Sequence, residues 1–169
     1  GGLPTCGTVA QVLTAKYADA LPLYRQAEML ARQGIELDRS TLARWVGIAA
    51  HHLRPVHEEL MRQVMASTKL FADETPAPTL EKGKPTTRQA YLWAYGRDDM
   101  PWNGPDPPAV VYRYATGRGQ DHPAKHLKDF TGTLQVDGYR AYNAVAARRA
   151  NGEIVLAHCW AHIRRPIYK

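Results

Sequence analysis

Two segments of this sequence end in an aspartate at the point where a strand pattern stops. Residues 69–75 are apolar and β-prone up to Phe71, reach Asp73, and then meet a proline that we expect to end regular pairing. Residues 133–139 repeat the arrangement with Asp137. Aspartate is a poor strand residue, and an acid at the end of a buried strand needs a partner. Two carboxylates from two strand ends could bind a divalent cation, because Mg²⁺ prefers oxygen ligands.

Each aspartate also has a simpler interpretation. Asp-Gly is a common turn, and an aspartate at a strand end often caps the next helix. The occurrence of two similar segments favours a shared site. Glu74, next to Asp73, would point to the other face of the strand because side chains alternate, so it is a poor substitute ligand.

The pattern after residue 66 predicts a mixed sheet. We expect strands near residues 69–75, 91–96, 110–114, 133–137 and 153–157, and helices near 122–130 and 142–149. A turn is expected at Asn151–Gly152, before the last strand. The first three strands, joined by short loops, suit an antiparallel meander, and the helix-linked strands suit parallel crossovers. This is the outline of a ribonuclease H-like domain. Its first and fourth strands are neighbours, so Asp73 and Asp137 can meet.

Residues 1–66 have helical periodicity, with Gly34 as a natural terminator and Asp38 or Ser40 as the N-cap of a helix that Pro55 should bend or restart. A helix, a glycine turn and a second capped helix form the outline of a helix-turn-helix.

Arg39 and Arg44 would then lie near the start of the second helix, where DNA contacts are made. An ordinary helical hairpin with solvated arginines fits the same pattern, and the sequence leaves both interpretations open.

The charge balance suits an anionic partner. The 169 residues carry a net charge of +6 with a pI of about 9.4, which favours nucleic acid among possible partners. The two cysteines make no disulfide framework, and no apolar run is long enough to cross a bilayer. The chain begins with Gly1 rather than Met, so we expect it to be a piece of a longer protein.

Three basic residues, Lys82, Lys84 and Arg88, follow the first strand and could hold DNA phosphates, or could form a solvated hairpin tip.

The aromatic strand around Trp93 could stack bases, but an aromatic strand face more often belongs to the hydrophobic core. Cys159 and His162 give a weak zinc signal, and packing with hydrogen bonding is the favoured interpretation.

Seven runs of residues together form a specific pattern, at 16–19, 21–26, 34–42, 72–76, 91–93, 134–139 and 159–165. Through these runs the chain resembles the transposases of the insertion sequence 66 family over nearly its whole length. The resemblance implies a DDE-type catalytic core that cuts and joins DNA with Mg²⁺ or Mn²⁺, with Asp73 and Asp137 as its first two acids and metal ligands. Arg164 and Arg165 belong to the last run and are expected to contact DNA.

The resemblance also implies a third acid, a glutamate on a helix beyond Lys169. We therefore expect an α+β chain with a helical region over 1–66 and an incomplete ribonuclease H-like core over 67–169. Such a truncated or decayed copy should be inactive alone. The implied partners are insertion-sequence ends, target DNA, further copies of the chain and accessory transposition proteins. The implied location of the protein is the bacterial nucleoid in the cytoplasm, away from membranes. The alternatives are a non-catalytic DNA-binding protein that interferes with the intact enzyme, and a relic.

Overall fold

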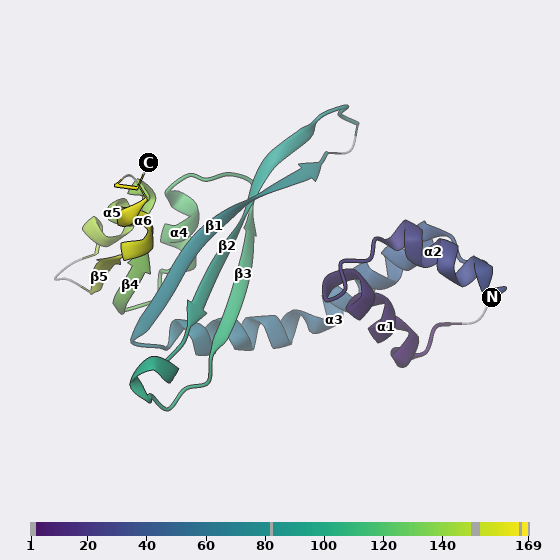
Figure 1. Cartoon of the computed structure of the whole chain (residues 1–169), viewed down its shortest axis with the longest axis horizontal. Coiled ribbons are helices and arrows are strands. Elements are labelled where there is room, and N and C mark those ends of the chain that lie inside the picture. Colours follow the sequence, from purple (N-terminus) through teal and green to yellow (C-terminus); the bar gives the residue numbers. More distant parts are fainter. Residues whose placement is uncertain (1–2, 82, 150–152, 166, 169) are drawn as a thin grey trace. The chain divides into compact units, whose positions relative to one another are not determined.

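The computed structural model describes residues 3–81, 83–149, 153–165 and 167–168. The chain divides into two compact units, residues 1–57 and 58–169. Figure 1 shows the three N-terminal helices and the sheet of the second unit.

The first unit contains α1 (Cys6–Tyr17), α2 (Leu23–Arg32) and the first part of α3 (Arg39–Met65). Thr5 caps α1 by accepting a hydrogen bond from the backbone N–H of Thr8 at 3.2 Å. Asp38 precedes α3, and its Oδ1 accepts from the N–H of Ser40 at 2.7 Å. The predicted N-cap at Asp38 is confirmed. The N-cap of α1 was not foreseen.

We expected Pro55 to bend or restart the third helix, and a restart is wrong, because α3 is continuous over 27 residues. A proline inside a helix removes one hydrogen bond to the carbonyl four residues before it, here that of His51. Residues 51–59 are all exposed, so water can satisfy that carbonyl. The helix passes from the first unit into the second shortly after this proline.

The second unit is built on a five-stranded mixed sheet in the order β3-β2-β1-β4-β5. The strands are β1 (Lys69–Leu80), β2 (Thr87–Arg97), β3 (Ala109–Ala115), β4 (Gly132–Val136) and β5 (Ile154–His158). β1, β2 and β3 form an antiparallel meander, while β4 is parallel to both β1 and β5. The predicted α+β class, the meander, the parallel crossovers and the neighbouring first and fourth strands are confirmed.

The expected end of β1 at Thr75–Pro76 is wrong, because the strand continues through Pro76 and Pro78 to Leu80. β4 pairs only with the start of β1, so the rest of β1 has β2 on one side and an open edge on the other. The two prolines stand two residues apart, so their nitrogens face the same way. They are tolerated because that direction is the open edge, where no ladder bond is lost.

Smaller differences concern the ends of the remaining elements. The structure has η1 (Met100–Trp102), α4 (Asp121–His126), α5 (Arg140–Ala147) and α6 (Trp160–Arg164). α4 is shorter than predicted, and Asp121 is its first residue rather than its cap. α6 was not predicted. The turn expected at Asn151–Gly152 lies outside the described residues.

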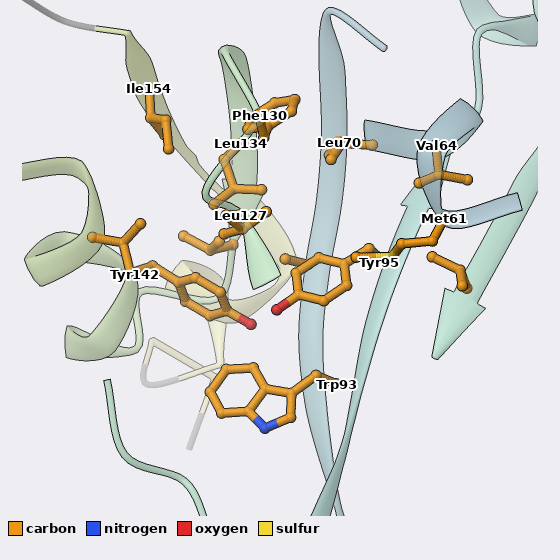
Figure 2. Close-up of a cluster of buried hydrophobic side chains, with 14 of the residues drawn as sticks. Met61, Val64, Leu70, Trp93, Tyr95, Leu127, Phe130, Leu134, Tyr142 and Ile154 are labelled. Atoms are coloured by element: carbon orange, nitrogen blue, oxygen red, sulfur yellow. The ribbon is translucent and has the colours of Figure 1, made fainter. Parts of the chain in front are cut away.

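One face of the sheet is covered by the end of α3, by α4 and by α5, and this side holds the hydrophobic core. Figure 2 shows Tyr95 and Tyr142 reaching toward each other above Trp93, and all three side chains are fully buried. The aromatic strand is therefore core, as the sequence favoured. None of the helices in the described ranges is both long and apolar enough to cross a membrane.

Candidate functional site

Asp73 and Asp137 occupy matching positions on neighbouring parallel strands. Lys69 of β1 pairs with Thr133 of β4, and each aspartate lies four residues further along its own segment. Asp73 is within β1, whereas Asp137 directly follows β4. The pairing of β1 with β4 ends at Phe71 and Gln135, so the register places both acids at the same level, two residues beyond the last paired residues.

Strand alternation places both aspartates on the face away from the core. Leu70 and Ala72 of β1 and Leu134 and Val136 of β4 are buried on the helix-covered side. The odd-numbered residues between them face the opposite way. On that second face Asp73 is exposed and Asp137 is half-buried.

Both aspartates line one cavity of about 270 Å³ on this face. Its floor comes from four strands and its rim from the start of α6; the lining residues include Phe71, Gln135, Ala94, Gly96, Val110, Cys159 and His162. The structure thus brings together the two acids that the sequence singled out, within a shared and accessible hollow.

Backbone N–H groups orient both carboxylates in the same way. The N–H of Glu74 donates to Oδ1 of Asp73 at 2.9 Å, and the N–H of Tyr139 donates to Oδ1 of Asp137 at 2.8 Å. The second contact closes a turn through Gly138, whose φ of 96° favours glycine. In the described part of the chain, neither Oδ2 atom accepts a hydrogen bond, so each carboxylate keeps one oxygen for a ligand.

The carboxylate oxygens of Asp73 and Asp137 are the type of ligand that Mg²⁺ and Mn²⁺ prefer. Carboxylate oxygens are hard ligands, and a magnesium ion commonly takes one or two of them while keeping several waters. No group of three or more His, Cys, Asp or Glu side chains among the described residues is arranged to hold a metal. The pair alone would therefore hold a divalent ion only weakly.

Glu74 lies on the core face, as alternation predicted, and its side chain is fully buried. Its Oε1 accepts from Nε of Arg118 at 2.8 Å, and its Oε2 accepts from the hydroxyl of Tyr142 at 3.1 Å. Burial raises the pKa of Glu74, and the bonds from Arg118 and Tyr142 oppose that rise. This carboxylate is committed to internal contacts, so it is not free to join the cavity.

Cys159 and His162 form part of the cavity wall at the start of α6. A hydrogen bond from His162 lowers the pKa of the Cys159 thiol. Nδ1 of His162 is buried and has no hydrogen-bond partner within the described chain. Their position next to the acids was not foreseen, because sequence spacing could not show that α6 returns to this cavity.

The basic residues of the β1–β2 turn lie far from the acids along the ladder. Asp73 pairs with Ala94 and Thr79 pairs with Arg88, a separation of six residues or about 20 Å. Arg88 and Lys84 both form ion pairs with Glu81. Lys82 lies outside the described residues.

The other basic candidates are distributed over both units. Arg39 is the first residue of α3, and Arg44 lines an apolar groove with residues of α1. Arg164 is the last residue of α6, and its guanidinium carbon lies 4.8 Å from the centre of the Tyr168 ring. Arg165, the C-cap of α6, is exposed.

Sequence reasoning missed Arg118, which contacts the residues that follow each aspartate. It lies in a segment that the sequence identifies only as a glycine-rich turn. An arginine in a polar loop carries no signal of a buried ion pair, since the partner is 44 positions away. Only the folded arrangement of β1, this loop and α5 reveals it.

A family model and several curated proteins match this chain. The family model described as "Transposase IS66 family" matches residues 1–169. In Sinorhizobium fredii (strain NBRC 101917 / NGR234), the uncharacterized protein y4qI is 47% identical over 171 residues, covering 99% of this chain and 32% of the relative. The uncharacterized protein y4jD of the same strain is 41% identical over 168 residues, covering 98% and 33%.

The chain spans about a third of the length of these relatives. The match to the family model, in contrast, extends from the first residue to the last. The chain therefore belongs to the transposase IS66 family.

Proposed function

We propose that residues 67–169 form part of a ribonuclease H-like, DDE-type core that cleaves and joins DNA, with Asp73 and Asp137 as two of its catalytic acids. The observation that carries this proposal is that both acids lie four residues beyond the paired residues Lys69 and Thr133, on one face and in one cavity. Membership in a transposase family supports the reaction class and DNA as the partner.

In this proposal the chain's own groups set up the site. The Oδ2 atoms of Asp73 and Asp137 would hold a divalent cation, while the N–H groups of Glu74 and Tyr139 hold each carboxylate in orientation. A divalent cation, when bound, supplies Lewis-acid stabilisation of the charge that develops at a scissile phosphate. Arg164 and Arg165 lie at the end of α6, from where they can contact the DNA backbone.

Metal titration of the 169-residue chain tests the acid pair. We expect Mn²⁺, followed by electron paramagnetic resonance, to bind with a Kd of roughly millimolar, as for sites with few charged ligands. Asp73→Asn and Asp137→Asn should each abolish that binding. Asp129→Asn is the matched control, because Asp129 is exposed and outside the cavity. Unchanged binding in both site variants would overturn the proposal.

We further expect this chain alone to show little or no strand transfer, because only two carboxylates converge among the described residues. The measurement is incubation of the purified chain with a DNA end and Mg²⁺. Cleavage or joining that disappears in Asp73→Ala would contradict the expected inactivity.

A non-catalytic DNA-binding role is the second candidate, and the net charge of +6 favours it. The helices α2 and α3, with Arg39 at the start of α3, would supply a helix-turn-helix-like contact. Salt-dependent DNA binding that survives Asp73→Ala combined with Asp137→Ala, but weakens in Arg39→Ala, would support this role. Binding that needs both aspartates would exclude it.

A further inference from the structure

Arg118 joins the two segments that carry the aspartates. It lies in the loop between β3 and α4, outside the cavity that the acids line. Its guanidinium contacts Glu74, the residue after Asp73, and Tyr139, which lies two residues after Asp137. A single side chain therefore touches both acid-bearing segments from the core side of the sheet.

The contact with Glu74 is a buried, charge-assisted pair. Both Nε and a terminal nitrogen of Arg118 donate to Oε1 of Glu74, and the Nε contact measures 2.8 Å. The Glu74 side chain is fully buried, whereas that of Arg118 is 44% exposed. The pair fixes the position of Glu74, because a buried carboxylate that lost its partner would be strongly destabilised.

The contact with Tyr139 has two parts. The Arg118 guanidinium carbon lies 4.0 Å from the centre of the Tyr139 ring, a close cation–π arrangement. The hydroxyl of Tyr139 donates to the backbone carbonyl of Arg118 at 2.8 Å. Side chain and backbone of the arginine thus hold the same tyrosine, which limits the movement of the turn after β4.

These two anchored residues are also the ones whose backbone N–H groups hold the carboxylates. Glu74 donates to Asp73 Oδ1, and Tyr139 donates to Asp137 Oδ1. A shift of either anchor would move the N–H group and therefore the carboxylate oxygen that it orients. The chain of contacts runs from one aspartate through Arg118 to the other.

We propose that Arg118 is a positioning residue that fixes the distance and orientation between the Asp73 and Asp137 carboxylates, so that both can bind one divalent cation. The proposal rests on the assignment of the two aspartates as metal ligands. Residues that orient metal ligands without touching the metal commonly change affinity by 10–100-fold when they are replaced.

Titration of Mn²⁺ into variants of the full 169-residue chain, followed by electron paramagnetic resonance, tests the proposal. Arg118→Ala should weaken Mn²⁺ binding by about tenfold or more. Arg118→Lys keeps the positive charge but loses the planar guanidinium, which donates two hydrogen bonds to Glu74 and stacks on the Tyr139 ring. It should therefore weaken Mn²⁺ binding by a smaller factor, about threefold. Arg148→Ala is the matched control, since Arg148 forms an exposed ion pair with Asp121 in the same unit and should bind like the wild type.

Two further variants separate positioning from general loss of stability. Tyr139→Leu removes both the stack and the hydroxyl bond and should weaken Mn²⁺ binding while Arg118 remains. Ile154→Val removes a methyl group from the core and leaves the contacts of Arg118 with Glu74 and Tyr139 in place. It should therefore lower the thermal midpoint and leave Mn²⁺ binding unchanged. If Arg118→Ala fails to fold, Arg118→Lys and Tyr139→Leu decide the outcome.

The outcomes distinguish this inference from the proposed function. Binding that is insensitive to Asp73→Asn and Asp137→Asn would overturn the metal site itself. Binding that depends on both aspartates, but is unchanged in folded Arg118→Lys and Tyr139→Leu, would overturn only the positioning role. A Mn²⁺ affinity that follows the thermal midpoint across all variants, Ile154→Val included, would also overturn it.

Discussion

The hydroxyl of Tyr142 donates to a buried carboxylate oxygen of Glu74, and hydrogen bonds to charged groups contribute more than neutral ones. We predict that Tyr142→Phe lowers the free energy of unfolding of the sheet-containing unit by about 1.5–3 kcal/mol. Tyr114→Phe is the matched control, because the Tyr114 hydroxyl makes a long 3.5 Å contact at an exposed position. That variant should change stability by less than about 0.5 kcal/mol. Equal losses in urea denaturation of the two variants would contradict the prediction.

His126 gives the same unit a dependence on pH. Burial, with Arg113, His122 and Lys125 nearby, lowers the pKa of His126 to about 4, and its Nδ1 lies 2.9 Å from the Tyr95 hydroxyl. Glu58, Arg62, Lys128 and Asp129 line the same surface hollow as His126. Between pH 4 and the ordinary value of 6.5 the unfolded chain binds more protons at this position, so stability rises with pH over that range.

We therefore predict that His126 makes a contribution to the free energy of unfolding that increases from pH 5 to pH 7, and that His126→Gln reduces the change over this range by about 1 kcal/mol after allowance for its partial exposure. Glutamine can keep the hydrogen bond with Tyr95. His52→Gln, at an exposed position in the helical unit, should leave the increase unchanged. Urea denaturation at the two pH values measures it, and an identical pH slope in wild type and His126→Gln would contradict the assignment.

At the scale of elements, sequence patterns located the strands better than their ends. The alternation around Trp93 and the apolar runs near Leu70 and Leu134 specify which face is buried, and the structure places all three in the core. The end of β1 could not be predicted from Pro76 alone. Whether a proline interrupts a sheet depends on whether its nitrogen faces a neighbouring strand or an open edge, and that is known only once the strand order is known.

The same limit applies to the site. The two aspartates could be found because each ends a strand pattern, and strand order then predicted that they would be neighbours. Arg118, Cys159 and His162 could not be assigned to the site, because loop and helix positions relative to the sheet depend on long-range packing. Periodicity indicates which face of a strand is buried, but it does not show where the loop with Arg118 or the short helix α6 lies relative to the sheet.

The open edge of β1 leads to an element-scale prediction. Pro76 and Pro78 contribute no N–H groups to that edge, which reduces its capacity to pair with another strand. We predict that Pro76→Thr combined with Pro78→Thr increases self-association, since two new N–H donors would face outward from an exposed strand. Ala77→Thr is the control, because its N–H faces β2. Sedimentation velocity over a concentration series measures the effect, and equal association of the double variant and wild type would contradict it.

At the scale of the whole molecule, the chain forms two compact units that share the helix α3. The stretch of α3 from residue 51 to 59 is exposed, so it buries little apolar surface that could couple the stability of one unit to that of the other. Leu42 is fully buried in the helical unit and Leu134 in the sheet unit. These two leucines provide a reciprocal pair of core substitutions with the same change in side-chain volume.

We predict that Leu134→Ala destabilises residues 58–169 by about 2–5 kcal/mol and leaves residues 1–57 unchanged, and that Leu42→Ala does the reverse. The reason is that a cavity acts on the cooperative unit that contains it, and separate units do not share one two-state transition. Hydrogen exchange followed by mass spectrometry resolves the two regions in the same sample. Faster exchange throughout the chain in either variant would show that α3 couples the two units into one cooperative structure, and the division into independent units would then be wrong.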